Sequence, residues 1–154
     1  MKIVVQRVSH ASVTIGGKIK SSIGKGYLIL LGIGTEDNEE DIDWLVKKIV
    51  GLRVFDDENG VMNRNILDAG GDIIVVSQFT LMASYKKGNR PGWSKAAPHD
   101  ISIPLYNRFC KALSDAMGKA EAGMLWITSQ VHRNIVAVAS LKELSAIIVV
   151  NERP

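Results

Sequence analysis

Short apolar runs separated by polar breaks follow one another along most of the chain, and most of them have the length of strands. Lys2 to Val8 and Ala11 to Ile15 are rich in β-branched residues, and every second residue of the latter run is apolar. A period of two predicts a half-buried strand, and Gly16-Gly17 predicts a hairpin turn after it. Tyr27 to Ile33 is apolar on both faces, which predicts a central strand covered from two sides.

Two segments have the spacing of amphipathic helices. The acidic stretch Glu36 to Asp43 opens the first, with negative charges near the positive end of the helix dipole. Pro104 predicts the first position of the second helix, and Gly118 predicts its end. The apolar positions at helical spacing are Ile42, Leu45, Val46 and Ile49 in the first, and Leu105, Phe109, Leu113 and Ala116 in the second.

The remaining elements are shorter. Leu52 to Phe55 predicts a strand, and the polar cluster Asp56 to Gly60 predicts a turn. Ile73 to Leu81 begins as a buried strand and becomes polar at its end, where side chains emerge at a sheet edge. Met82 to Ser102 is irregular, and Ala146 to Val150 predicts a final strand. Together these elements predict an α/β fold in which strands dominate and two main helices are present.

Composition narrows the class of protein. The chain has 154 residues, of which 46% are hydrophobic, so we expect one domain over residues 1–154 with a single core. The formal net charge of +3 permits a phosphate-bearing partner without requiring one. The first residues predict a strand and not a signal peptide, and no apolar run approaches the roughly 20 residues that span a bilayer. We therefore expect a cytoplasmic protein.

Most familiar catalytic arrangements are missing from the sequence. The three histidines, His10, His99 and His132, have no helical i, i+4 spacing and no cysteine ligands beside them, so no metal site is predicted. Gly24-Lys25-Gly26 precedes a strand, whereas a phosphate-binding loop precedes a helix, so it predicts a plain turn. Cys110 lies among apolar residues, where a small buried side chain is expected. We expect neither a metal nor an organic cofactor.

Two neighbouring segments carry the candidate chemistry. Ser77, Gln78 and Thr80 lie at the polar end of the buried strand, where they are either ordinary strand-end residues or part of a site. The loop that follows holds four cations and a tryptophan: Lys86, Lys87, Arg90, Lys95 and Trp93. Such a loop is commonly just solvated, but an aromatic ring among cations also suits RNA, because rings stack on bases while cations bind phosphates.

The stretch Val75-Val76-Ser77-Gln78-Phe79-Thr80-Leu81 closely resembles the SQFTL signature of D-aminoacyl-tRNA deacylases, also called D-tyrosyl-tRNA(Tyr) deacylases. Further segments resemble the same family in the same order: Val5-Gln6-Arg7-Val8, Ala11-Ser12-Val13-Thr14, Leu30-Leu31-Gly32-Ile33, Leu52-Arg53-Val54-Phe55, Met62-Asn63 and Lys87-Gly88-Asn89-Arg90-Pro91. The resemblance covers roughly residues 1–118, and ordered agreement over that length is far more specific than one motif.

The resemblance implies a compact β-rich α/β fold with an antiparallel or mixed, barrel-like sheet, and a homodimer. It implies hydrolysis of the ester that joins a D-amino acid, or glycine in some members, to the terminal adenosine of tRNA. It also implies that Phe79 and Thr80 supply backbone N–H groups to the oxyanion while Ser77 and Gln78 orient the substrate. The residues that the resemblance and the basic loop assign to substrate or tRNA binding are Arg7, Lys86, Lys87, Arg90, Pro91 and Trp93.

The resemblance breaks in the tail. Family members end with an N-x-G-P-V-T motif whose Gly-cis-Pro excludes L-amino acids, but none of this chain's prolines, Pro91, Pro98, Pro104 and Pro154, follows a glycine. Three explanations remain open for residues 119–154: another chirality filter, a member that binds tRNA ends without catalysis, or an altered reading frame. The alternative functions are accordingly a noncatalytic tRNA-binding dimer and, with less support, a general small-ester hydrolase.

Overall fold

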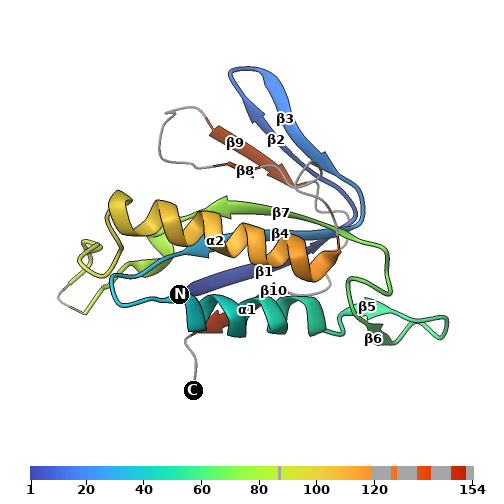
Figure 1. The fold of residues 1–154 in the computed structure, drawn as a ribbon. Helices are drawn as coiled ribbons and strands as arrows, with labels where there is room; N and C mark the ends of the chain where they lie inside the picture. Colours follow the sequence, from blue (N-terminus) through green and yellow to red (C-terminus); the bar gives the residue numbers. More distant parts are fainter. Residues whose placement is uncertain (87, 119–125, 128–134, 140–146, 152–154) are drawn as a thin grey trace.

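The protein is seen here as a computed structural model, which describes residues 1–86 and 88–118 with their side chains, and the backbone of 126–127, 135–139 and 147–151. The elements form three layers, with two helices on one face of a central sheet and a second sheet on the other (Figure 1). The expected α/β class is confirmed.

The central sheet is mixed, as predicted. Its strands lie in the order β10 (Ile147–Asn151), β1 (Lys2–Val8), β4 (Gly26–Gly32), β7 (Asp72–Ser77) and β8 (Trp126–Ile127). β1 is antiparallel to both neighbours, whereas β4, β7 and β8 run parallel to one another. The predicted central strand is therefore β4, and the predicted final strand is β10 at the edge; Ala146 lies outside the described residues. The expected closure into a barrel stays a prediction.

The smaller sheet has the order β3 (Lys18–Ile23), β2 (Ala11–Ile15) and β9 (Ile135–Ala139). β2 and β3 form the predicted hairpin, in which Gly16 and Gly17 have φ angles of 57° and 77°. Two successive positive φ angles match a type I′ turn, which glycine adopts without strain. Apolar side chains of β2 and β3 pack against β4 and β7 across the interface between the sheets.

Helix α1 (Glu39–Gly51) buries the four apolar residues predicted for it. It begins three residues after the start of the acidic stretch, because Asn38 provides the cap. The Asn38 side chain accepts a hydrogen bond from the Glu40 N–H at 2.9 Å, and the Asp41 carboxylate accepts one from the Asn38 N–H at 2.9 Å. This capping box satisfies N–H groups that a helix leaves without partners at its start.

Helix α2 (His99–Met117) corrects the predicted start at Pro104, which instead lies inside the helix. The helix begins earlier because the Ile101 and Ser102 N–H groups donate to the Pro98 carbonyl, at 3.1 and 2.8 Å. Pro104 is exposed and costs the helix one i→i−4 hydrogen bond. The buried face includes Phe109 and Leu113 as predicted, but Ala116 is exposed. Gly118 ends the helix with φ 62°, as predicted.

The segment after α1 also differs from expectation. Only Phe55 of the predicted strand Leu52 to Phe55 is in a strand, because β5 (Phe55–Asp56) pairs with β6 (Met62–Arg64) in a short hairpin. The predicted turn joins these strands. The Asp57 carboxylate accepts the Asn59 and Val61 N–H groups at 2.9 and 3.1 Å, and these bonds hold the pKa of Asp57 below its usual value.

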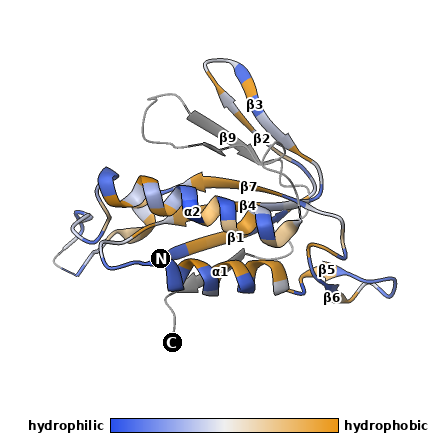
Figure 2. Ribbon diagram, in the orientation of Figure 1, coloured by the Kyte–Doolittle hydropathy of each residue, from blue (hydrophilic) through white to orange (hydrophobic). Residues whose placement is uncertain are grey.

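The main core lies between the helices and the central sheet. Its largest fully buried side chains include Tyr27 on β4, with Tyr106 and Phe109 on α2. Figure 2 shows the matching pattern, with hydrophobic colour along β7 and alternating hydrophobic and hydrophilic colour along both helices. Among the described residues, no helix is long and apolar enough to cross a membrane.

Candidate functional site

The polar end of β7 leads directly into a single 3-10 turn, η1 (Phe79–Met82). Val76 is 4% exposed, Ser77 and Gln78 are half-buried, and Phe79 is 43% exposed. The backbone N–H of Gln78 donates to the Leu31 carbonyl at 2.8 Å, so the ladder between β4 and β7 continues up to the turn. The sequence motif therefore emerges from the core onto the surface within four residues, on a rigid support.

Two backbone N–H groups stand at the start of the turn. In the described part of the chain, the N–H groups of Gln78, Leu81 and Ala83 donate the backbone hydrogen bonds found in and beside this turn. The N–H groups of Phe79 and Thr80 lie at the open start of the turn, where a helix leaves its donors without internal partners. The Gln78 side-chain amide donates to the Thr80 hydroxyl, so both polar side chains are held at this start.

Gly32 at the end of β4 allows the turn to approach closely. A Cβ atom built on Gly32 would lie 2.9 Å from the Leu81 Cβ and 3.1 Å from the Gln78 carbonyl oxygen. A Cβ on Gly34 would lie 2.8 Å from the Met82 Cε. The sequence marked this strand as buried but gave no sign that its glycines set the position of η1.

An aromatic pair covers one side of the turn. The rings of Phe79 and Trp93 meet edge to face, with 5.3 Å between their centroids and 64° between their planes. Trp93 is brought there because the chain after it is bonded to the extension of β4: Ala97 N–H donates to the Ile33 carbonyl at 2.9 Å. The structure thus brings Trp93 into contact with Phe79 of the Ser77–Thr80 motif, a contact that the sequence alone did not indicate.

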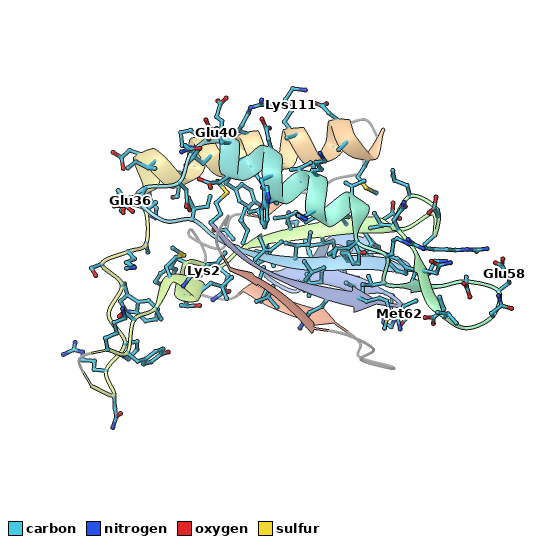
Figure 3. All side chains as sticks on the ribbon, turned by 90° about the horizontal axis from the view of Figure 1, so that it is seen from below. Lys2, Glu36, Glu40, Glu58, Met62 and Lys111 are labelled. Carbon is cyan, nitrogen blue, oxygen red and sulfur yellow. The ribbon has the colours of Figure 1, made fainter. Side chains whose placement is uncertain are left out.

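The cations of the loop lie at its surface. Lys86, Arg90 and Lys95 are exposed and Pro91 is half-buried, whereas Lys87 lies outside the described residues. Figure 3 shows this loop extending from the body at the end opposite the β5–β6 hairpin, where Glu58 and Met62 are labelled. The predicted basic surface is thus next to the aromatic pair and projects away from the core.

Arg7 lies apart from these residues within the chain. Arg7 on β1 pairs with Tyr27 at the start of β4, whereas Ser77 on β7 pairs with Leu31 near the end of β4. Four residues of strand separate the two positions by about 13 Å along β4. The guanidinium of Arg7 donates to the Val54 carbonyl and to the Asp56 carboxylate, the latter at 3.2 Å. Within one chain, its observed contacts therefore hold the segment after α1 against the sheet.

A cavity of about 590 Å³ lies behind the turn, where Met82 and Lys95 contribute to its lining. Three carboxylates, those of Glu36, Asp37 and Asp41, line it together with three cationic groups, the Met1 N-terminus, Lys2 and Lys95. The Met1 N-terminus forms an ion pair with Asp37, so the lining carries no excess of negative charge.

Two residues of α2 lie close to β7, and the sequence did not indicate that one of them, Tyr106, supports the site. The buried Tyr106 hydroxyl donates to the Val75 carbonyl at 2.9 Å, two residues before Ser77, and so fixes β7 against α2. Cys110 is buried beside it, and burial raises the pKa of its thiol to about 12. Cys110 is thus a neutral core residue, as predicted, and not a thiolate nucleophile.

No strong base or nucleophile was predicted for this region. His10 is exposed beside Ser9, and His99 is the first residue of α2, whereas His132 lies outside the described residues. Among the described side chains, no group of three or more His, Cys, Asp or Glu residues is placed to hold a metal ion. What the exposed turn offers chemically is backbone N–H donors, one hydroxyl and one amide.

Known proteins resemble the chain over most of its length. A family model described as D-Tyr-tRNA(Tyr) deacylase matches residues 4–138. A D-aminoacyl-tRNA deacylase of Bacteroides thetaiotaomicron is 71% identical over 119 residues, covering 77% of this chain and 79% of that protein. One from Dechloromonas aromatica is 58% identical over 120 residues, covering 78% and 80%. These alignments span about the length over which the resemblance was expected, and the match of the family model runs further, to residue 138.

Two solved structures share the fold. A protein described as c-Myc DNA Unwinding Element Binding Protein aligns over 100% of both chains, with a TM-score of 0.87 and 34% identity. A probable eukaryotic D-amino acid tRNA deacylase aligns over 97% of this chain and 98% of its own, with a TM-score of 0.76 and 14% identity. At that identity the second alignment speaks for the fold alone.

Proposed function

The chain belongs to the D-Tyr-tRNA(Tyr) deacylase family, and from this we propose that it hydrolyses the ester between a D-amino acid and the terminal adenosine of tRNA. The products are the free D-amino acid and the tRNA. The observation that carries the proposal is the family match over residues 4–138, which includes the exposed turn that follows β7. Relatives named D-aminoacyl-tRNA deacylase support the same activity.

We assign the catalytic contribution to backbone geometry. In ester hydrolysis the oxygen of water attacks the carbonyl carbon, and negative charge develops on the carbonyl oxygen. The N–H groups of Phe79 and Thr80 lie at the start of the turn and are not among the donors of the backbone hydrogen bonds found there in the described residues, which suits them to bind this oxygen. Fixed donors of this kind stabilise the transition state by about 3 to 4 kcal/mol each.

Thr80 serves as a positioning residue in this mechanism and not as a nucleophile. The Thr80 hydroxyl accepts a hydrogen bond from the Gln78 side-chain amide. An amide is not a base, so it removes no proton from the hydroxyl. When the tetrahedral intermediate collapses, the ester C–O bond breaks and the leaving ribose oxygen takes up the proton that the attacking water gives up. The neighbouring 2′-OH of the ribose is suited to relay that proton from the water to the leaving oxygen, so the enzyme needs little more than orientation.

Around the turn, we propose that Ser77 and Gln78 orient the terminal adenosine, while Lys86 and Arg90 lie along the phosphates of the tRNA end. The support for this is the exposure of both cations beside the Phe79–Trp93 pair. Lys87 and Pro91 belong to the same proposed surface by sequence. We further propose that the protein works as a homodimer in the cytoplasm, where aminoacyl-tRNA is used, and that Arg7 meets substrate only if a second subunit completes the site.

Thr80→Ala is expected to retain turnover within about tenfold of the unaltered protein, because the backbone donors remain in place. Single-turnover hydrolysis of D-tyrosyl-tRNA measures this, with circular dichroism to check the fold. Thr14→Ala on β2 is a matched control for the substitution itself. A loss of about a thousandfold or more in a folded Thr80→Ala protein would mean that the hydroxyl is the nucleophile or a proton carrier.

The proposed function itself is tested by incubating the protein with D-tyrosyl-tRNA and, separately, with L-tyrosyl-tRNA. Loss of the ester from the D form alone supports the proposal and shows that chirality is enforced without a Gly-Pro pair. Loss from both forms supports deacylation but without chiral selection. Loss from neither contradicts the proposal and favours a tRNA-binding protein without turnover.

A further inference from the structure

The loop after η1 is a short antiparallel hairpin. Ser84 and Gly92 exchange both backbone hydrogen bonds, each at 2.9 Å. Side chains alternate between the two faces of such a pair, so residues on either side of Ser84 and Gly92 project to the same face. Ala83, Tyr85, Pro91 and Trp93 therefore share one face of the hairpin.

That face carries an unusual amount of exposed aromatic surface. Tyr85 is 63% exposed and Trp93 is 39% exposed, and the Trp93 ring contacts Phe79, itself 43% exposed. Large apolar side chains exposed together on one surface indicate a binding site more often than isolated ones do. We name the surface formed by Phe79, Tyr85, Pro91 and Trp93 the aromatic face. It begins at the catalytic turn and runs toward the tip of the hairpin.

The charged residues of the segment that carries Tyr85 and Trp93 are all positive. Residues 82–97 contain Lys86, Lys87, Arg90 and Lys95 and no aspartate or glutamate. None of the ion pairs found in the described part of the chain involves Lys86 or Arg90. Exposed aromatic rings edged by cations are the combination that binds single-stranded nucleic acid, since rings stack on bases and cations attract phosphates.

The dimensions of the face also fit a short stretch of nucleotides. Ala83 lies across the hairpin from Trp93, and Tyr85 is two residues further along the same strand. Two residues of extended chain span about 6.6 Å. Nucleotides stacked along one strand are separated by about 3.4 Å. With one nucleotide at Phe79, the distance from Trp93 to Tyr85 therefore leaves room for about two more.

We propose that the aromatic face binds the unpaired nucleotides that precede the terminal adenosine of the tRNA, by stacking their bases on Tyr85 and Trp93. This inference rests on the proposed function and adds to it the part of the substrate that this surface recognises. Only unpaired bases offer their faces to aromatic side chains, so the proposal concerns the single-stranded 3′ end and not the paired stem. Tyr85 is its test residue, because nothing places Tyr85 at the ester.

Tyr85→Ala is expected to raise KM for D-tyrosyl-tRNA by about tenfold, in keeping with about 1 to 3 kcal/mol for one stacked base. The value of kcat should stay within about twofold. For D-tyrosyl-adenosine, which lacks the preceding nucleotides, KM should not change. Tyr85→Phe keeps the ring and should restore the KM of the unaltered protein. Met62→Ala, an exposed apolar residue at the opposite end of the molecule, is the matched control.

The outcomes separate this inference from the proposed function. Hydrolysis by the unaltered protein tests the function. The change that Tyr85→Ala causes in KM for D-tyrosyl-tRNA, compared with the change for D-tyrosyl-adenosine, tests the aromatic face. An equal KM for D-tyrosyl-tRNA in Tyr85→Ala and the unaltered protein overturns the inference even when hydrolysis is normal. If the unaltered protein hydrolyses neither substrate, the Kd for uncharged tRNA decides: weaker binding in Tyr85→Ala, lost when the last three nucleotides are removed, supports the inference, and unchanged binding overturns it.

Discussion

Replacing Gly26 by alanine is expected to destabilise the protein by about 4 kcal/mol or more, enough to leave much of it unfolded. Gly26 opens β4 and pairs with Asp72, the first residue of β7. A Cβ atom on Gly26 would lie 1.8 Å from the Asp72 carbonyl oxygen and 2.7 Å from the backbone nitrogen and carbonyl carbon of the same residue. Only movement of the backbone relieves such contacts, so the two central strands must separate at this end.

Urea unfolding followed by circular dichroism measures this effect, with soluble yield as a second readout. Gly24→Ala is the matched control, because a Cβ at Gly24 meets no atom within 4 Å and its φ is not positive. If Gly26→Ala unfolds at the same urea concentration as Gly24→Ala, the close pairing of β4 with β7 is wrong. Since β7 leads into η1, that result would also remove the structural basis for the proposed site.

The elements with strong periodicity were predictable from the sequence. β4 was identified as a covered central strand because it is apolar on both faces, and it lies third of five in the sheet. The buried positions of α1 followed from helical spacing alone. In both cases the hydrophobic pattern that selects the secondary structure is the same pattern that packs the core, so local and tertiary forces agree.

The errors arose where a local rule competed with packing. Pro104 satisfied the preference of proline for the first turn, yet Ile101 before it packs against the main core and α2 begins at His99. Leu52 and Val54 are suited to a strand by type, but the residues after α1 have no strand partner until Phe55 meets Arg64. Whether a segment finds a strand partner depends on the tertiary structure, and no local sequence pattern indicates it.

The candidate site was predictable as a list of residues but not as an arrangement. The motif at Ser77–Thr80 and the loop with Trp93 were both recognised, and the structure joins them through the Phe79–Trp93 contact. Arg7 belonged to the same list, but lies near the other end of β4. The aromatic character of Tyr85 became meaningful only once the Ser84–Gly92 pairing placed it on the face that holds Trp93.

Gly32→Ala is expected to lower kcat by about a hundredfold while the protein stays folded, because it displaces η1, the turn proposed to bind the oxyanion, without opening the core. The added Cβ would lie 2.9 Å from the Leu81 Cβ and 3.1 Å from the Gln78 carbonyl oxygen, so η1 must move by some tenths of an ångström or more. Oxyanion donors act only at close range, and a displacement approaching 1 Å costs about this much in rate. The substitution therefore tests whether the position of the turn, and not any one side chain, carries the reaction.

Single-turnover hydrolysis of D-tyrosyl-tRNA and of D-tyrosyl-adenosine measures the effect of Gly32→Ala, and thermal unfolding checks the fold. Gly51→Ala at the end of α1 is the matched control, because a Cβ there meets no atom within 4 Å. Both substrates should lose rate equally, since the turn acts at the ester that they share, whereas Tyr85→Ala should affect the tRNA substrate alone. A folded Gly32→Ala protein with unaltered kcat would show that the N–H groups of Phe79 and Thr80 are not the oxyanion donors, because their displacement would then have no cost.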